Sequence, residues 1–443
     1  MIEPNWIWGL IEVIVLVTLC IVGPHIFAAI GFTAAIFAIL YYDDVRSIVL
    51  IGNTLWSQHF TYTMSMVPLF ILMGAWVESS GLGKDAYDCF MKWLARVKGG
   101  LAYVSVLATG VFGAVSGSGI ATVAAIGGIG LPEMKRYGYS APLRTGSIVS
   151  GVMIDNLIPP SVTAVLYSLL TDESIGKMFI GGIVPGIVLM FLISVIIYVW
   201  VTLRPAAAPR LPSEVRFTLM EKIKGSASTF PIGIIFFFMI GGLYFGWISA
   251  TEAGAVGAFS VLIIAIVFRR MNRKIFAAGL RGASRTTAML LIMIGGAFVF
   301  AATMMMTRLS DQLGVIIQGI GLDFIPLAYL YMVLIIIVGV PLDTMAILIV
   351  FMPIFYPIFK LMPDAPPMAG IWFGIMNVIL CSLAALTPPI GTPLYLTQMI
   401  DGCATKEVFK GVVPFYVSTV ALMALLIHFP FLATWLPSKM IGG

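Results

Sequence analysis

The sequence predicts an all-α polytopic membrane protein, an inverted repeat in which three spans, a re-entrant hairpin and two further spans occur twice. Three observations support this fold class. Apolar stretches of about 20 residues, the length of a bilayer-crossing helix, recur throughout the chain. Basic residues gather on one side of the resulting topology, and a Pro-Pro break occurs at corresponding positions of the two halves.

The composition requires a membrane environment. Hydrophobic residues make up 60% of the 443 residues, charged residues 10%, and the mean hydropathy is +1.05. A soluble domain carries about 25% charged residues. The apolar runs lack the period-two alternation of a barrel strand. No Lys or Arg precedes the first apolar run, so we expect a retained span rather than a cleaved signal peptide.

Several kinds of chemistry are disfavoured. The four Cys and three His are scattered, with no zinc-ligand or disulfide spacing. The stretch GLGKD at 81–85 lacks the upstream Gly and the Ser/Thr of a P-loop. A membrane-embedded enzyme would need clustered catalytic residues, which the sequence does not offer. We expect membrane lipids around the chain, no nucleic-acid partner, and no ATP hydrolysis by a P-loop.

Two apolar segments are too long for one simple helix. They are 101–131, interrupted by VSGSGIAT at 115–122, and 328–361, interrupted by VGVPLDT at 338–344. The remaining candidate spans are 6–22, 25–41, 61–79, 145–169, 179–203, 229–248, 252–268, 286–306, 371–399 and 412–436.

The basic residues orient these segments. Basic residues flank 101–131 on both sides, so this segment enters and leaves from the cytoplasm as a re-entrant hairpin. Threading the chain from there places 20 of the 25 basic residues in the cytoplasm and the N-terminus in the periplasm. The five outside are Arg46, Lys177, Arg308, Lys360 and Lys439. The segment 328–361 then becomes a hairpin entered from the periplasm.

The predicted order of elements is the same in both halves. The first repeat, 1–203, contains scaffold spans at 6–79, an amphipathic connector at 84–98, the hairpin 101–131, a broken span at 145–169 and a span at 179–203. A cytoplasmic linker, 204–228, follows. The second repeat, 229–443, contains scaffold spans at 229–306, the hairpin 328–361, a broken span at 371–399 and a span at 412–436. Each broken span holds a Pro-Pro pair, in LIPPSV (157–162) and LTPPIG (386–391), 229 residues apart. Inverted repeats of this kind are typical of secondary transporters.

The four breaks predict binding sites. Non-helical backbone at membrane depth persists only inside protein or beside a wet cavity, and its free carbonyls suit Na⁺. The first predicted Na⁺ site comprises Ser116, Gly117, Ser118, Asp155, Asn156 and Pro159. The second comprises Gly339, Pro341, Asp343, Thr344, Thr387 and Gly391. Between them, the predicted substrate-binding residues are Gly119, Pro160, Ser161, Pro388, Pro389 and Thr392.

Simpler interpretations remain for each feature. The SGSG tip could serve close helix packing, and Pro-Pro could be only a kink. An intramembrane Asp costs about 2.5–3.5 kcal/mol on insertion scales. Asp155 and Asp343 both fall at breaks, which favours ligand roles, although Asp155 could instead carry a proton or accept structural hydrogen bonds. Glu12 and Glu78 lie nearer span ends, where we expect snorkelling or a partner-facing role.

Seven stretches of the sequence together carry a resemblance to a known family. They are VPLFILMGAWVESSGLG (67–83), VKGGLAYVSVLATGVFGAVSGSGIATVAAIG (97–127), LPEMKRYGY (131–139), IPPS (158–161), TEAGAVGA (251–258), RTTAMLL (285–291) and LTPPIGTPLYL (386–396). With them the chain resembles, over nearly all 443 residues, the large membrane subunit, DctM-like, of the tripartite ATP-independent periplasmic (TRAP) transporters. The resemblance implies an elevator fold in the bacterial inner membrane. It also implies Na⁺-driven uptake of a carboxylate, sugar acid or sulfonate, with a small four-helix membrane subunit (DctQ-like) and a periplasmic binding protein.

The sequence departs from that family's pattern at the proposed sites. Asp155 and Asn156 stand where the family usually has Gly and an apolar residue or Pro. Pro393 replaces a common Asn, and Leu-Cys-Ser at 380–382 replaces a frequent Asn-x-Glu. The ligand set is therefore open. A single-component carrier of a related fold is the alternative, and co-purification with a small membrane subunit would distinguish the two.

Labelling of single cysteines should report the predicted topology. Cysteines at 92, 138 and 215 should react from the cytoplasm, and those at 174, 310 and 365 from the periplasm, because the basic residues are so unevenly distributed. The measurement is reaction with an impermeant maleimide in oriented vesicles. Positions 92 and 138 reacting from opposite sides would contradict the first hairpin.

Overall fold

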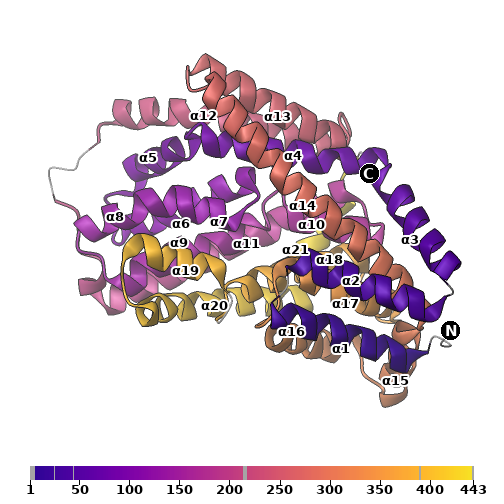
Figure 1. The fold of residues 1–443 in the computed structure, drawn as a ribbon. Helices are drawn as coiled ribbons and strands as arrows, with labels where there is room; N and C mark the ends of the chain where they lie inside the picture. The colour runs from indigo at the N-terminus through magenta and orange to yellow at the C-terminus, as the bar shows by residue number, and fades with distance from the viewer. Residues whose placement is uncertain (1–4, 24, 43, 213–216, 389–390, 442–443) are drawn as a thin grey trace.

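The computed structural model describes residues 5–23, 25–42, 44–212, 217–388 and 391–441, and within these ranges every regular element is a helix (Figure 1). The first half contains α1 (Trp6–Val22), α2 (Ile26–Tyr41), α3 (Asp44–His59), η1 (Tyr62–Ser65), α4 (Met66–Ser79), α5 (Leu82–Leu94), α6 (Gly100–Ser116), α7 (Gly119–Thr122), η2 (Val123–Gly127), α8 (Gly128–Arg136), α9 (Ala141–Asp155), α10 (Val162–Thr171), α11 (Ile175–Leu203) and η3 (Pro205–Ala207). The second half contains α12 (Leu219–Tyr244), α13 (Ala250–Val267), α14 (Arg273–Met306), α15 (Leu309–Ile320), α16 (Phe324–Val338), α17 (Thr344–Leu361), α18 (Ala369–Ala385), α19 (Thr392–Asp401), α20 (Thr405–His428) and α21 (Phe431–Ser438). The all-α fold class is confirmed.

Long apolar helices are the main component. In the described part of the chain, five helices are long and apolar enough to cross a membrane, and six if the bent pair of α3 and α4 counts as one span. Helix α1 begins and ends at the residues predicted for the first span. The first turns are set by polar caps. The Asn5 side chain accepts from two backbone amides of α1, and capping boxes start α12 (Thr218 and Glu221) and α13 (Ser249 and Glu252).

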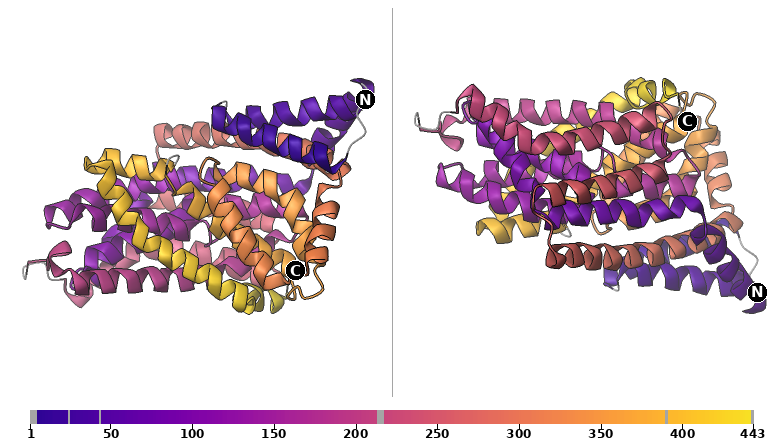
Figure 2. Two further views of the ribbon diagram at one scale, coloured as in Figure 1. Left: turned by 90° about the horizontal axis from the view of Figure 1, so that it is seen from below. Right: turned by 90° about the horizontal axis from the view of Figure 1, so that it is seen from above.

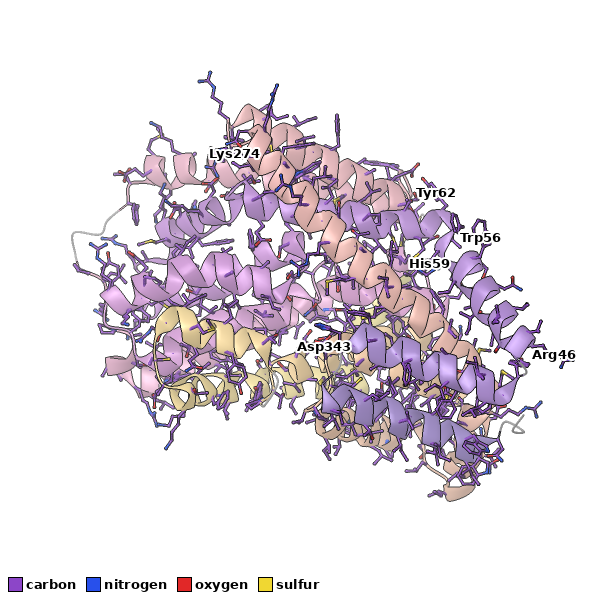
Figure 3. All side chains as sticks on the ribbon, viewed as in Figure 1. Arg46, Trp56, His59, Tyr62, Lys274 and Asp343 are labelled. Carbon is purple, nitrogen blue, oxygen red and sulfur yellow. The ribbon has the colours of Figure 1, made fainter. Side chains whose placement is uncertain are left out.

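Three sequence predictions need correction, and one helix was not predicted. The span predicted at 61–79 is only part of a longer element, because α3 precedes it and meets it at a 64° bend, along which Trp56, His59 and Tyr62 lie (Figure 3). The predicted span 412–436 is interrupted at Phe429, between α20 and α21. The predicted linker 204–228 already contains the first turns of α12. Helix α15, an amphipathic element, was not predicted.

Helices α2, α14, α4 and α13 pack side by side in one layer, which we call the scaffold (Figure 2). Helix α14 packs against both α2 and α4, and α13 packs against α4 and α12. Glu12 of α1 is fully buried, with its carboxylate accepting hydrogen bonds from the Tyr41 hydroxyl (3.3 Å) and from Thr303 Oγ1 (2.6 Å). The expectation that Glu12 snorkels or faces a partner is therefore wrong, because it joins α1 to the scaffold helices α2 and α14.

Each predicted hairpin returns to the end from which it starts. In the first, the Leu101 amide donates to the Tyr139 hydroxyl (3.4 Å) and Ser105 donates to the Met134 sulfur (3.7 Å), so α6 and the η2–α8 segment run back along each other. In the second, the Phe324 amide at the start of α16 donates to Asp364 Oδ2, just beyond α17 (2.7 Å). Whether these segments are re-entrant in the membrane stays a prediction.

The two broken spans interlock the halves of the chain. Helices α9 and α10 flank the first break, at 156–161, and α18 and α19 flank the second, at 386–391. Helix α10 packs against α17 and α18, which belong to the second half. Helix α19 packs against α7, η2 and α9, which belong to the first half. Each helix that follows a break therefore completes the packing around the other half's hairpin.

A buried ion pair fixes one of these crossings. Arg144, near the start of α9, donates from Nε and Nη2 to Asp401, the last residue of α19 (2.5 and 2.9 Å), and the Asp401 side chain is fully buried. Burial raises the pKa of Asp401, but hydrogen bonds from Arg144 and Cys403, together with the charges of Arg144 and Lys135, hold this pKa below its ordinary value. At the other crossing, Glu173 accepts hydrogen bonds from Lys360 and Tyr356 (3.2 and 2.6 Å).

Removing the Asp401 charge should destabilise the protein strongly. Asp401→Asn leaves the Arg144 guanidinium buried without its counter-ion, which typically costs about 3–5 kcal/mol. Thermal unfolding of the purified protein in detergent measures the effect. The matched control is Glu407→Gln, which breaks the more exposed pair with Lys410 and should cost at most about 1 kcal/mol. Equal stability of the two variants would contradict the structural role of the pair.

Candidate functional site

The first break lies directly against the first hairpin. Helices α6 and α9 approach so closely at Gly113 that a Cβ added there would lie 2.1 Å from the Asp155 Cβ. Real Cβ atoms do not come this near one another, so only glycine allows the approach. Asp155 is the last residue of α9 and is 3% exposed. The sequence thus places a carboxylate at the point where the helix stops and the hairpin tip begins.

The Asp155 carboxylate is without a protein partner. Among the described residues, neither Oδ1 nor Oδ2 accepts a hydrogen bond, although both are buried. Its neighbours include Gly113 and Gly119, and a Cβ on Gly119 would lie 3.7 Å from Oδ2. A buried carboxylate that is ionised needs hydrogen bonds or a cation to offset the loss of hydration. The position is therefore suited to a cation or to a proton.

The hairpin tip is held by its own hydroxyls. Gly117 has a φ of +65°, and Ser118 caps α7 by accepting from the Ala121 amide (3.3 Å). Ser116 Oγ lies 2.9 Å from Thr122 Oγ1, in contact for a hydrogen bond. In the break, Ser161 caps α10 by accepting from the Ala164 amide (3.2 Å). These local bonds turn the backbone at both places without a regular helix.

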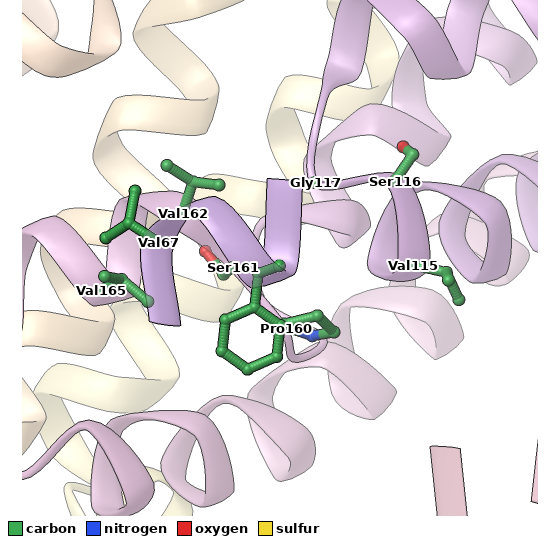
Figure 4. A pocket seen from close by; sticks show the side chains of 9 residues that line it. Val67, Val115, Ser116, Gly117, Pro160, Ser161, Val162 and Val165 are labelled. Atoms are coloured by element: carbon green, nitrogen blue, oxygen red, sulfur yellow. The ribbon is translucent and has the colours of Figure 1, made fainter. Parts of the chain in front are cut away.

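A small cavity lies between the tip and the break (Figure 4). Its volume is about 20 Å³, and its walls include Ser116 and Gly117 of the tip and Pro160 and Ser161 of the break. This volume admits roughly one water-sized particle. The structure thus brings together four of the residues predicted for the first site and its substrate face. Pro159 lies buried beside Pro160, and the Asn156 amide oxygen accepts a hydrogen bond from Thr163 (3.3 Å).

The second break has a related but looser arrangement. Asp343 caps α17, accepting from the Met345 amide (3.4 Å), and lies toward the middle of the molecule (Figure 3). Thr344 Oγ1 donates to the Cys381 carbonyl of α18 (3.5 Å), and a Cβ on Gly339 would lie 2.8 Å from the Ala384 Cβ. The second hairpin therefore packs on α18, the helix that leads to the second break.

The remaining predicted residues are placed as follows. Thr387 donates to the Leu383 carbonyl (2.8 Å), and the Gly391 amide donates to the Thr387 carbonyl (3.3 Å). Pro341 and Pro388 are half-buried, and Thr392, the first residue of α19, is exposed. Pro389 lies outside the described residues, so its predicted role has no structural account.

Some residues at or near the breaks were not predicted from the sequence. Thr122 holds the Ser116 hydroxyl, and Gly113 admits Asp155. Tyr331 of α16 donates to the side chain of the fully buried Asn377 of α18 (2.5 Å). The Tyr416 hydroxyl of α20 donates to the Leu386 carbonyl, which the second break frees from the helix. Polar residues in apolar helices were a detectable signal, but their partners lie far away in sequence.

The oxygen-rich lining of the first break differs from a transition-metal site. In the ranges that the structure describes, no three His, Cys, Asp or Glu side chains gather in a way that could hold a metal ion. The oxygen atoms at the first break are carbonyls, hydroxyls and one carboxylate, which are hard ligands suited to an alkali cation rather than to zinc.

Helical hairpins facing broken helices inside a multi-pass membrane fold define a helical transport protein. The sequence model of the tripartite ATP-independent periplasmic transporter, DctM component, matches residues 13–432, and the chain belongs to this family. The family implies a multi-pass inner-membrane protein that imports a substrate with a periplasmic binding protein and a small membrane subunit.

Curated relatives match over most of the chain. One is the C4-dicarboxylate TRAP transporter large permease protein DctM of Pseudomonas aeruginosa, 29% identical, covering 93% of this chain and 94% of the relative. Another is the 2,3-diketo-L-gulonate TRAP transporter large permease protein YiaN of Escherichia coli, 30% identical, covering 91% and 93%. A third is the sialic acid TRAP transporter large permease protein SiaM of Vibrio cholerae, 25% identical, covering 86% and 87%.

Solved structures share the fold at low sequence identity. MtrF of Neisseria gonorrhoeae, from a class of antimetabolite efflux pumps, aligns with a TM-score of 0.62 and 12% identity over 97% of this chain and 96% of that one. The YdaH transporter of Alcanivorax borkumensis aligns with a TM-score of 0.60 and 13% identity over 87% and 89%. These structures support the fold class alone.

Proposed function

We propose that the chain is the transport subunit of a Na⁺-coupled importer of a small organic anion, which a periplasmic binding protein delivers. A small four-helix membrane subunit completes the complex. The observation that carries the proposal is Asp155, a buried carboxylate at the junction of a hairpin and a broken helix that accepts no hydrogen bond from any described residue. Ionisable groups at such junctions are typical of ion pathways in transporters.

Sodium fits the chemistry of the first break. An adjacent cation offsets the cost of burying the Asp155 charge, and the tip and break supply further oxygen atoms. In the proposed first site, the hydroxyls of Ser116 and Ser118 and the backbone of Gly117, Asn156 and Pro159 complete the ligand set. The proposed second site uses the oxygen atoms of Gly339, Pro341, Asp343, Thr344, Thr387 and Gly391.

The ends of two short helices suit an anionic substrate. Helix α10 begins at Val162, after Pro160 and Ser161, and α19 begins at Thr392, after the second Pro-Pro pair. Helix N-termini present free amides and a positive dipole end to an anion. Relatives are named for C4-dicarboxylates, 2,3-diketo-L-gulonate and sialic acid, and we propose a carboxylate, sugar acid or sulfonate for this chain.

Movement of one group of helices, as a rigid body, relative to a second group would carry the substrate across the membrane. We assign the hairpins and broken helices to the moving body and the scaffold helices to the fixed one. Helix α5 connects them, and its Asp85 pairs with Arg270, which follows α13 (2.7 Å). This ion pair keeps α5 attached to the scaffold while the hairpins move, as an elevator mechanism requires.

Uptake should depend on a Na⁺ gradient and not on ATP. In proteoliposomes that hold the membrane complex, an inward Na⁺ gradient with the loaded binding protein should drive accumulation of the anion, because the breaks supply oxygen ligands for Na⁺. The measurement is uptake of radiolabelled substrate. Undiminished uptake with K⁺ in place of Na⁺, and without a pH gradient, would rule out sodium coupling.

Asp155→Asn should weaken Na⁺ dependence while the protein still folds. Loss of the carboxylate should raise the half-saturating Na⁺ concentration by at least about tenfold, equivalent to about 1.4 kcal/mol of binding free energy. Transport is measured against Na⁺ concentration at several pH values. Asp343→Asn should act separately, on the second site, and the exposed Asp172→Asn serves as the control. An Asp155→Asn protein with wild-type Na⁺ half-saturation that loses only its pH response would identify a proton site instead.

A further inference from the structure

A glycine of the scaffold lies under the tip of the first hairpin. A Cβ added to Gly74 of α4 would lie 2.3 Å from the carbonyl oxygen of Ser116 and 2.9 Å from its carbonyl carbon. These are backbone atoms at the end of α6, so they cannot move aside as a flexible side chain would. Gly74 therefore permits a contact between the scaffold and the hairpin that no other residue type permits.

The same face of α4 covers the first break. Val67 and Phe70 line the cavity of about 20 Å³ beside the tip, and they lie seven and four residues before Gly74, on one side of the helix. Met73 lines a second cavity of about 10 Å³ together with Val115 and Pro160. Helix α4 therefore forms the scaffold-side wall of the first site, with Gly74 at the point of closest approach.

Other glycines of the scaffold differ in what they contact. Gly254 of α13 faces Leu69 and Phe70 of α4, and Gly257 faces Met73 of α4 and Met239 of α12, so neither glycine meets the hairpin. Gly31 of α2 has no atom within 4 Å of an added Cβ. Gly74 instead meets backbone of the hairpin. A requirement for glycine at this position thus concerns the contact between the two bodies and not the packing of the scaffold itself.

We propose that Gly74 is a positioning residue on which the tip of the first hairpin closes, so that α4 seals the first cation site. The inference rests on the proposed function. A side chain at position 74 holds Ser116 away from α4 and opens the cavity between Val67, Phe70 and the break. The contact is broken and remade whenever the hairpin moves relative to the scaffold, so it belongs to the transport cycle and not only to folding.

Access to the cavity tests the proposal without measuring transport. Val165 lines the cavity and is 4% exposed, and a Val165→Cys reporter is placed in a chain whose four native cysteines are replaced by alanine. Its reaction rate with N-ethylmaleimide in proteoliposomes should rise about tenfold when Gly74→Ala is added. A small shift of the equilibrium between the closed and the open cavity, toward the open one, is enough to give this change. The matched control is Gly31→Ala, which should leave the rate unchanged. Equal rates with Gly74→Ala and Gly31→Ala would overturn the proposal.

A second variant covers the case in which Gly74→Ala fails to fold. Met73→Cys and Val115→Cys introduce thiols on opposite walls of the same small cavity, without a change at Gly74. A disulfide formed between them with copper phenanthroline as the oxidant should hold the tip on α4 and abolish uptake, while each single-cysteine variant should keep it after the same treatment. Crosslinked protein that transports at the uncrosslinked rate would show that the tip need not leave Gly74, and the proposal would fail.

The two experiments separate this inference from the proposed function. If uptake proves independent of Na⁺ but the labelling and crosslinking results hold, Gly74 still positions the hairpin and only the identity of the coupling ion is wrong. If uptake depends on Na⁺ but Gly74→Ala changes neither labelling nor uptake, the sodium proposal stands and the role of Gly74 is refuted.

Discussion

Backbone hydrogen bonding is the constraint on which the rest of the structure depends. Inside an apolar medium, a peptide group that leaves a helix must find a partner within the protein. Helices are interrupted at the two hairpin tips and at the two Pro-Pro pairs, and groups within the protein satisfy several of the freed backbone atoms there. Ser161 and Ser118 cap the helices that restart, Asp343 caps α17, and Tyr416 donates to the freed Leu386 carbonyl. Among the described residues, none donates a hydrogen bond to the buried Asp155 carboxylate. A buried carboxylate in this situation needs a cation or a proton to offset its lost hydration.

Much of the architecture could be predicted from hydropathy and charge, because both are properties of short stretches of sequence. Apolar length located α1, α2, α11 and α13, and interruptions by Gly, Ser and Pro located the four breaks. The 64° bend before α4 was missed because α3 is polar enough to resemble a loop. The interruption at Phe429 was missed because the apolar run continues through it. The interruption at Phe429 does not lower the average hydropathy, so a window of about 20 residues cannot detect it.

The candidate site was predictable in part for a similar reason. Residues that are energetically costly inside a membrane helix, such as Asp155 and the Pro-Pro pairs, are easily recognised in an apolar sequence. The residues that contact them are not recognisable in this way. Gly113, Thr122 and Gly74 are ordinary residues for a membrane helix, and their roles arise only when α6, α9 and α4 come together. Glu12 shows the opposite error, because its position near a span end suggested exposure, whereas Tyr41 and Thr303 enclose it.

The crossing of α10 and α19 into opposite halves bears on how the protein is made. When the ribosome has released the first half, α10 still lacks α17 and α18, against which it packs, and η2 still lacks α19. The first hairpin therefore remains incompletely covered while more than half of the chain is synthesised and inserted. Neither half can mature alone, and the last strongly packed helices to enter the membrane close the sites of both. Such a chain completes the packing around both breaks in a single late step, after the scaffold is already in the bilayer.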